Sequence, residues 1–339
     1  MHFNIIFLDT TANKYYDSTT LEREPLGGTE ATIIRIAESL AQVGLSVAVV
    51  QTTCPPFEPV MGQYCFFMHN TSLPSNVTCD YFIQIRGISN SHLFPEAKKY
   101  VWMHDLGHEK MKDWPDKLNK YNIKMIAVSR WHKKNLKKYL EGYDNITYIY
   151  NPVPDSLFIP PDKRSAYDKN LIAWLSSPHK GLGNATRLFK KLHELRPQMK
   201  FLIFNPGYLQ IDTVALSSNK NVYYSGPENC KTVWSVLQRC LCVFYPTNWE
   251  ETFGCVASEA NALGVPLATY KKGALNEVVT SNDQLLEDGD EDGIIQRVID
   301  WYDSGRPLIH GNEEFKLSVV VDDWLSMFKR SSPKIITKK

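Results

Sequence analysis

Residues 241–266 have the sequence LCVFYPTNWEETFGCVASEANALGVP, and this stretch decides the fold class. The apolar run Leu241–Tyr245 is typical of a buried strand. We expect a short helix over Gly254–Leu263, because Gly264 and Pro266 follow it as helix stops. A buried strand that leads through a loop into a helix is the repeating unit of a parallel α/β sheet.

Two carboxylates lie at this strand-to-helix junction. Glu251 is in the loop and Glu259 is in the second turn of the expected helix, roughly 8 Å along the axis from its start. They can accept hydrogen bonds from hydroxyls at opposite ends of one ligand. The N–H groups of Gly254, Cys255 and Val256, at the helix start, attract an anion between those ends. A nucleotide sugar has this layout of sugar, diphosphate and ribose.

The motif resembles the E-x7-E signature of retaining GT-B glycosyltransferases of the family 4 type. Phe253 and Gly254 lie between the two carboxylates, and residues 259–266 match the EAxAxGxP pattern that follows the signature. The resemblance implies that Glu251 binds hydroxyls of the donor sugar and that Glu259 binds the ribose. It places Phe253 and the three residues after it in the donor site.

The resemblance covers most of the chain, being sharpest over residues 241–277 and weaker over 27–153. It implies a hexosyltransferase that moves a sugar, with retention, from a UDP or GDP sugar to a glycan, a lipid-linked acceptor or a small molecule. It also implies that the reaction needs no metal and no cofactor besides the donor itself.

Short apolar runs alternate with amphipathic helical patterns along the sequence, which predicts parallel sheets covered by helices. Residues 148–170, rich in proline and aspartate, are the expected linker. We therefore predict two Rossmann-like, doubly wound domains: an N-terminal acceptor domain at 1–152 and a donor domain at 153–310. The resemblance implies that they face each other across a cleft, and that a helix at about 314–330 packs back onto the first.

Individual elements follow from the same patterns. The expected strands are Phe3–Leu8, Ser46–Gln51, Tyr81–Ile85, Tyr100–Met103, Ile123–Val128, Leu171–Leu175, Lys200–Phe204, Val222–Ser225, Leu241–Tyr245 and Pro266–Tyr270. The expected helices are Thr29–Val43, Arg130–Leu140, Asn184–Leu195, Cys230–Gln238, Gly254–Leu263, Glu291–Asp303 and Glu314–Lys329.

Two glycines, Gly27 and Gly28, precede the first expected helix. They let a backbone approach a phosphate without interference from a β-carbon, and Thr29 is a candidate cap at an anion-attracting helix start. The resembled family has a Gly-Gly loop here, against the diphosphate or the acceptor. The resemblance therefore favours a ligand-binding role for Gly27 and Gly28 over the alternative of a plain turn. It also places the nucleotide base near Gly226.

Lys180 follows the strand Leu171–Leu175 and is the cation expected to neutralise the leaving diphosphate. The SSPxKGL pattern around it resembles a subgroup of the family that has SSPxRGL. The chain departs from the family at Leu175, where an arginine is usual. Arg86 is a second candidate for the missing charge. The alternative for Lys180 is a solvated surface lysine.

His104 follows the strand Tyr100–Met103. A histidine at the carboxyl end of a strand can titrate near neutral pH and contact a ligand there. The resembled family often has a histidine at this place that touches the donor sugar or polarises the reaction centre. We therefore include His104 with Glu251 and Lys180 among the catalytic candidates. The alternative is a structural histidine that is hydrogen-bonded in a turn.

The formal net charge of +1 gives no strong global field, so no nucleic-acid partner is expected. The start MHFNIIFLDTT is typical of a first strand, and no apolar run reaches the roughly 20 residues of a bilayer span. We expect a cytoplasmic protein. Lysines on one face of a predicted helix are candidates for peripheral membrane contact, with a solvated face as the alternative; they are Lys133, Lys134, Lys137 and Lys138.

Two other functions stay open at this point. A nucleotide-sugar epimerase of the GT-B fold would use the same donor and would need no acceptor. A non-catalytic module that binds nucleotide sugars would keep the fold. The leucine at position 175 favours such a module, whereas the presence of both Glu251 and Glu259 argues against it.

Overall fold

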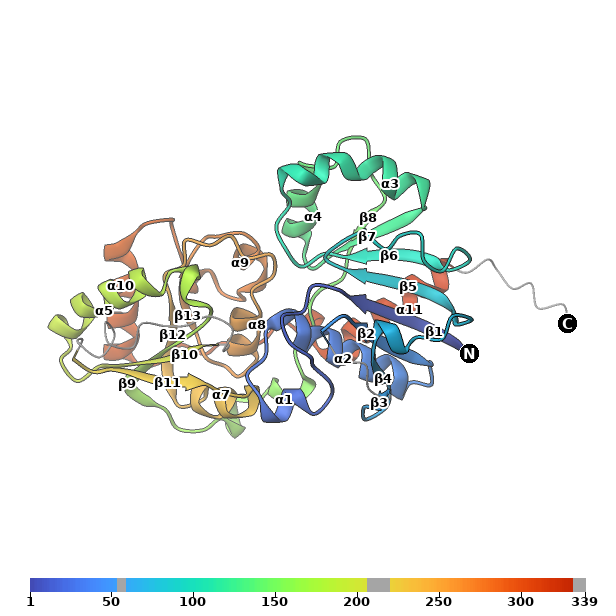
Figure 1. Cartoon of the computed structure of the whole chain (residues 1–339). Coiled ribbons are helices and arrows are strands. Elements are labelled where there is room, and N and C mark those ends of the chain that lie inside the picture. The colour runs from blue at the N-terminus through green and yellow to red at the C-terminus, as the bar shows by residue number, and fades with distance from the viewer. Residues whose placement is uncertain (54–58, 206–219, 332–339) are drawn as a thin grey trace, which may run out of the picture. The chain divides into compact units, whose positions relative to one another are not determined.

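The computed structural model describes residues 1–53, 59–205 and 220–331. The chain forms two compact units, each with its own sheet (Figure 1). The first unit consists of Met1–Thr19, Thr29–Pro152 and the residues from Glu314 onward, and the second of Thr20–Gly28 and Val153–Glu313.

An eight-stranded sheet forms the core of the first unit. In chain order the strands are β1 (His2–Asp9), β2 (Val47–Gln51), β3 (Val60–Met61), β4 (Phe66–His69), β5 (Thr78–Ile85), β6 (Lys98–Trp102), β7 (Ile123–Ala127) and β8 (Ile146–Tyr148). Their order in the sheet is β3-β4-β2-β1-β5-β6-β7-β8, and every neighbouring pair is parallel except β3 with β4. From β4 to β7 this is a doubly wound order, in which the winding direction reverses between β1 and β5.

The helices of the first unit are α2 (Gly28–Gln42), α3 (Trp114–Lys120), α4 (Arg130–Lys137) and α11 (Leu317–Ser331). The last of them, α11, packs on the sheet through aromatic side chains. Trp324 is fully buried, with ring centroids 6.0 Å from Phe7 and 4.8 Å from Trp102. The ring of Phe328 lies 4.3 Å from that of Tyr81. Large aromatic surfaces thus hold the end of the described chain against β1, β5 and β6.

The second unit has a six-stranded sheet in which every pair is parallel. Its strands are β9 (Asp168–Leu175), β10 (Lys200–Asn205), β11 (Val222–Pro227), β12 (Cys240–Tyr245), β13 (Leu267–Tyr270) and β14 (Leu285–Leu286), and its helices are α1 (Thr20–Arg23), α5 (Leu182–Leu195), α7 (Cys230–Leu237), α8 (Cys255–Ala262), α9 (Leu275–Val278) and α10 (Glu291–Ser304). The order β11-β10-β9-β12-β13-β14 is again doubly wound, with the reversal between β9 and β12.

These two sheets confirm the predicted fold class, and each expected strand and helix is present with bounds within three residues of the expected ones. The sequence patterns missed the short elements β3, β4, β8, β14, α1, α3 and α9, because such elements hold too little of a period to be recognised.

Two boundaries differ from the prediction for a visible reason. β9 begins at Asp168, inside the predicted linker, because this polar residue pairs with Cys240 of β12. The helix α2 begins at Gly28, so Thr29 is its second residue and the prediction that Thr29 caps it is wrong. The Thr29 hydroxyl instead accepts a hydrogen bond from Arg86 at 2.6 Å.

Within the described ranges, no helix combines the length and the apolar composition that a bilayer crossing requires. In the same ranges, no three His, Cys, Asp or Glu side chains gather as metal ligands would.

Candidate active site

Lys180 and Glu251 lie together in the second unit. They follow β9 and β12, the adjacent strands between which the winding direction reverses. Nζ of Lys180 lies 2.9 Å from Oε1 and 3.0 Å from Oε2 of Glu251. Open α/β sheets bind ligands at this topological switch point, outside the carboxyl ends of the strands. The structure therefore brings two of the three catalytic candidates to the place where this fold positions a ligand.

A second donor holds the Glu251 carboxylate, whose side chain is 9% exposed. The hydroxyl of Tyr245, the last residue of β12, lies 2.5 Å from Oε1. Burial, reinforced by the Glu251 charge, raises the pKa of Tyr245 well above its usual value, so the phenol stays protonated and donates a hydrogen bond to the carboxylate. The Ser176 hydroxyl lies 3.3 Å from the phenol oxygen and can donate to it.

The backbone of Glu251 is fixed by the loop that leads to α9. Its carbonyl accepts a hydrogen bond of 2.8 Å from the N–H of Ala274. Gly273 has φ +56°, and a β-carbon there would lie 2.3 Å from the carbonyl oxygen of Glu251. Glycine is required at this position, both for its left-handed conformation and for the close approach.

The helix α8 begins beside this carboxylate. Gly254 is its N-cap residue with φ +95°, and a β-carbon at Gly254 would lie 3.8 Å from Cβ of Glu251. Phe253 is buried, whereas Cys255 and Val256 are partly exposed. The first turn of α8 carries no acidic side chain, so no carboxylate of that turn counters the positive end of the helix dipole.

Glu259, in the second turn of α8, is oriented by a neighbouring helix. Its Oε2 accepts a hydrogen bond of 2.8 Å from the indole Nε1 of Trp234 on α7. Neither Trp234 nor Tyr245 belongs to a motif that predicts a functional role. Aromatic side chains in an apolar pattern look like core, and their polar atoms gain a role only through the partner that the fold supplies.

Gly27 and Gly28 belong to the segment Thr20–Gly28, which is part of the second unit. A β-carbon at Gly28 would lie 3.3 Å from Sγ of Cys255, so the glycine loop lies against the start of α8. Gly226, by contrast, is in the edge strand β11, which β10 and β9 separate from β12.

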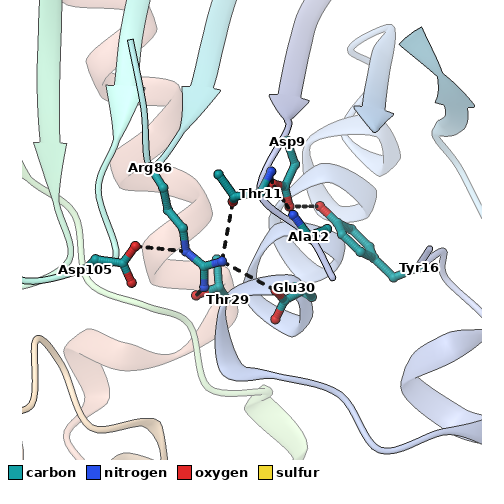
Figure 2. Close-up of polar contacts among 8 residues, drawn as sticks. All are labelled: Asp9, Thr11, Ala12, Tyr16, Thr29, Glu30, Arg86 and Asp105. Carbon is teal, nitrogen blue, oxygen red and sulfur yellow. Dashed lines mark hydrogen bonds and ion pairs between the residues drawn. The ribbon is translucent and has the colours of Figure 1, made fainter. Parts of the chain in front are cut away.

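The switch point of the first unit carries its own polar network, drawn in Figure 2. Asp9 ends β1 and is fully buried. Its Oδ1 accepts from the N–H groups of Thr11 and Ala12 at 2.9 and 3.1 Å, and its Oδ2 accepts from the Tyr16 hydroxyl at 2.9 Å. Asp9 thus fixes the loop that leaves β1.

Arg86 follows β5, next to β1, and has a left-handed backbone with φ +61°. Its guanidinium donates to Thr29 at the start of α2, and lies 3.7 Å from Oε1 of Glu30 and 3.5 Å from Oδ2 of Asp105, as Figure 2 shows. The Arg86 side chain is 20% exposed and that of Asp105 is 62% exposed. Arg86, the second candidate for the charge expected at the diphosphate, is therefore engaged by carboxylates of its own unit.

His104 lies after β6 in this same unit and is buried, with its ring 4.7 Å from that of Trp102. Burial is the main cause that lowers the pKa of His104 well below its usual value, and the nearby positive charge of Arg86 adds to it. The imidazole is therefore neutral at physiological pH.

Comparisons with known proteins give a family match for the second unit. Residues 167–310, which span the second unit from β9 to α10, match the family of glycosyl transferases group 1. No curated protein sequence matches the chain.

Solved structures match over nearly the whole chain. A sucrose-phosphate synthase from Thermosynechococcus elongatus is 14% identical, with a TM-score of 0.74, over 97% of this chain and 99% of that one. HepE of Anabaena in complex with UDP-glucose is 15% identical, with a TM-score of 0.68, over 97% and 100%. A glycosyltransferase from Rickettsia africae is 16% identical, with a TM-score of 0.67, over 99% and 100%. Residues 167–310 thus match the glycosyl transferases group 1 family, and the chain as a whole has the GT-B fold of these solved structures.

Proposed function

We propose that the chain is a retaining glycosyltransferase, that its donor is a UDP-sugar, and that Lys180, Glu251 and Glu259 hold this donor. Glu251 binds hydroxyls of the sugar, Lys180 binds the diphosphate, and Glu259 binds the ribose. The ion pair of Lys180 with Glu251 at the switch point of the second sheet carries this proposal. The fold likeness to HepE, solved with UDP-glucose, supports uridine as the base.

The chemistry that we propose is substitution at the anomeric carbon on the face from which the diphosphate leaves. The bond from C1 to the phosphate oxygen breaks, a bond from C1 to the acceptor oxygen forms, and the acceptor proton passes to the leaving phosphate. The Lys180 ammonium and the N–H groups at the start of α8 stabilise the charge that develops on the diphosphate. Glu251 orients the sugar, and no protein nucleophile takes part.

We assign the acceptor to the carboxyl end of the first sheet. The carboxylates of Asp9, Glu30 and Asp105 outnumber the single guanidinium of Arg86 in this group. Carboxylates accept hydrogen bonds from hydroxyls and repel phosphates. These surroundings favour a neutral glycan or polyol over a phosphorylated acceptor. His104, neutral and next to this group, remains a candidate contact.

Peripheral membrane contact through α4 and the residue after it is a further part of the proposal. Lys134, Lys137 and Lys138 are exposed, and Lys133 is partly buried. Lys137 pairs with Asp144 at 2.9 Å, which reduces the charge available to a lipid surface. Co-sedimentation with vesicles of anionic and of neutral lipid tests this contact. Equal binding to both kinds of vesicle would contradict a membrane contact through these lysines.

Calorimetric titration with a panel of UDP and GDP sugars tests the proposed donor. We expect one UDP-sugar to bind. Glu251→Gln should lower the affinity for that UDP-sugar more than it lowers the affinity for UDP. Incubation of the bound donor without an acceptor distinguishes an epimerase, which would convert the sugar, from a transferase. Binding of none of the panel would contradict the proposal.

A further inference from the structure

The Glu251 carboxylate has two donors with different freedom to move. Tyr245 ends a strand, is fully buried and packs its ring 4.9 Å from that of Trp174. Lys180 ends a short 3-10 turn, and its side chain is 23% exposed on a flexible stem. The phenol is therefore the stationary partner of Glu251, and the ammonium is the movable one.

The two proposed roles of Lys180 compete with each other. Its Nζ bonds both oxygens of Glu251, and the same ammonium is needed by the diphosphate. Position 175, at the end of β9, carries a leucine and supplies no second cation. When the donor binds, Lys180 must shift toward the phosphates, and Glu251 then loses the partner that neutralises it. A buried carboxylate that loses its counter-ion needs another hydrogen-bond donor to stay in place.

We propose that Tyr245 is a positioning residue, whose hydroxyl keeps the Glu251 carboxylate aimed at the donor sugar after Lys180 has moved to the diphosphate. Its hydroxyl lies 2.5 Å from Oε1 of Glu251. Since Oε1 accepts the hydrogen bond of the phenol, Oε2 becomes the oxygen that receives a sugar hydroxyl once the ammonium has left. The inference deepens the proposed donor site and rests on it.

The test uses Tyr245→Phe, which keeps the ring and its packing and removes the hydroxyl. Calorimetry compares UDP, which has no sugar, with the UDP-sugar that the wild-type protein binds. We expect the affinity for UDP to stay within about twofold and the affinity for the UDP-sugar, with kcat/KM, to fall about ten- to a hundredfold, the range for a hydrogen bond to a charged group. In the Glu251→Gln background the same substitution should have little further effect.

Tyr270→Phe is the matched control, because Tyr270 is a buried tyrosine on the neighbouring strand β13. It should leave both affinities unchanged. Ser176→Ala is a second variant that keeps the Tyr245 ring and phenol. It should lower the affinity for the UDP-sugar by a smaller factor than Tyr245→Phe does.

Three results would overturn the inference. They are wild-type affinity for the UDP-sugar in Tyr245→Phe, an equal loss for UDP and UDP-sugar with a lowered melting temperature, and a full additional loss in the Glu251→Gln background. If the wild-type protein binds no nucleotide sugar, the proposed function falls, and the inference falls with it. If the wild-type protein binds the UDP-sugar and Tyr245→Phe binds it equally well, the inference about Tyr245 is overturned and the proposed function stands.

Discussion

The indole N–H of Trp234 donates a hydrogen bond of 2.8 Å to the carboxylate of Glu259, and thereby ties α7 to the second turn of α8. Glu259 is the proposed ribose ligand. The bond from the indole to Oε2 fixes the direction of the carboxylate that would receive the ribose hydroxyls. A side chain outside the E-x7-E motif therefore sets the orientation of one of its two acids.

Trp234→Phe removes this donor and keeps an aromatic ring. We expect the affinity for UDP and for the UDP-sugar to fall together, by about tenfold or more, because a hydrogen bond to a charged group contributes about 1.5 kcal/mol or more. Calorimetry with both ligands measures it. Trp301→Phe, in the buried face of α10, is the control and should change neither affinity. A loss confined to the UDP-sugar would contradict the assignment of Glu259 to the ribose.

Gly273→Ala should abolish donor binding. Its β-carbon would lie 2.3 Å from the carbonyl oxygen of Glu251 and 2.6 Å from its nitrogen, so the backbone of Glu251 must shift. Gly289→Ala shares the strain of a left-handed backbone, with φ +78°, but its β-carbon would meet nothing within 4 Å. Gly289→Ala should lose about 1 to 2 kcal/mol of stability in thermal unfolding through this strain, and Gly273→Ala should lose more because its β-carbon also meets backbone atoms. Donor affinity that survives in Gly273→Ala would show that the position of Glu251 does not matter.

Lys180→Met should lower kcat/KM for transfer by about a hundred- to a thousandfold, the range measured for removal of one preorganised donor to a developing anion. Lys191→Met is the control, because Lys191 forms a half-exposed ion pair with Glu291 at 3.4 Å. Exposed pairs contribute little, so transfer by that variant should match the wild type. Initial rates at saturating acceptor give the comparison, and similar rates in both variants would remove Lys180 from the mechanism.

His132 should make the first unit sensitive to acid. Its Nε2–H donates to the carbonyl of Asp105 at 2.7 Å, and its Nδ1 accepts from the N–H of Val128 at 3.2 Å. Burial lowers the pKa of His132 to about 4, against about 6.5 in an unfolded chain. A proton on Nδ1 would face the Val128 N–H, so the native state excludes it.

The unfolded chain therefore binds a proton below about pH 6.5 that the native state does not bind until about pH 4. The contribution of His132 to the free energy of unfolding should be constant above pH 6.5. Between pH 6.5 and pH 4 it should fall by about 1.4 kcal/mol for each pH unit. An NMR titration of the ring in the folded protein should have its midpoint near pH 4. A midpoint near 6.5 would contradict the buried, neutral imidazole.

The sequence predicted the second sheet and the strand, loop and helix that carry Glu251 and Glu259 well, because this motif is continuous in the chain. A strand, a loop and a helix follow one another within 241–266, and the glycine N-cap at Gly254 lies where the pattern placed the helix start. The contact between Lys180 and Glu251 could not be predicted from the sequence, because it depends on the pairing of β9 with β12.

The polar network of the first unit could not be read from the sequence. Asp9, Glu30, Arg86 and Asp105 belong to no motif, and the sheet order alone brings them to one edge. The left-handed conformation of Arg86 gave no signal either, because a non-glycine residue with positive φ is held there by its surroundings.

A crystal structure with the intact UDP-sugar bound tests the central claim most directly. We expect Nζ of Lys180 about 3 Å from a diphosphate oxygen, Glu251 within hydrogen-bonding distance of a sugar hydroxyl, and the Tyr245 hydroxyl still on Glu251. A donor bound elsewhere, with Lys180 still paired to both oxygens of Glu251, would contradict the account.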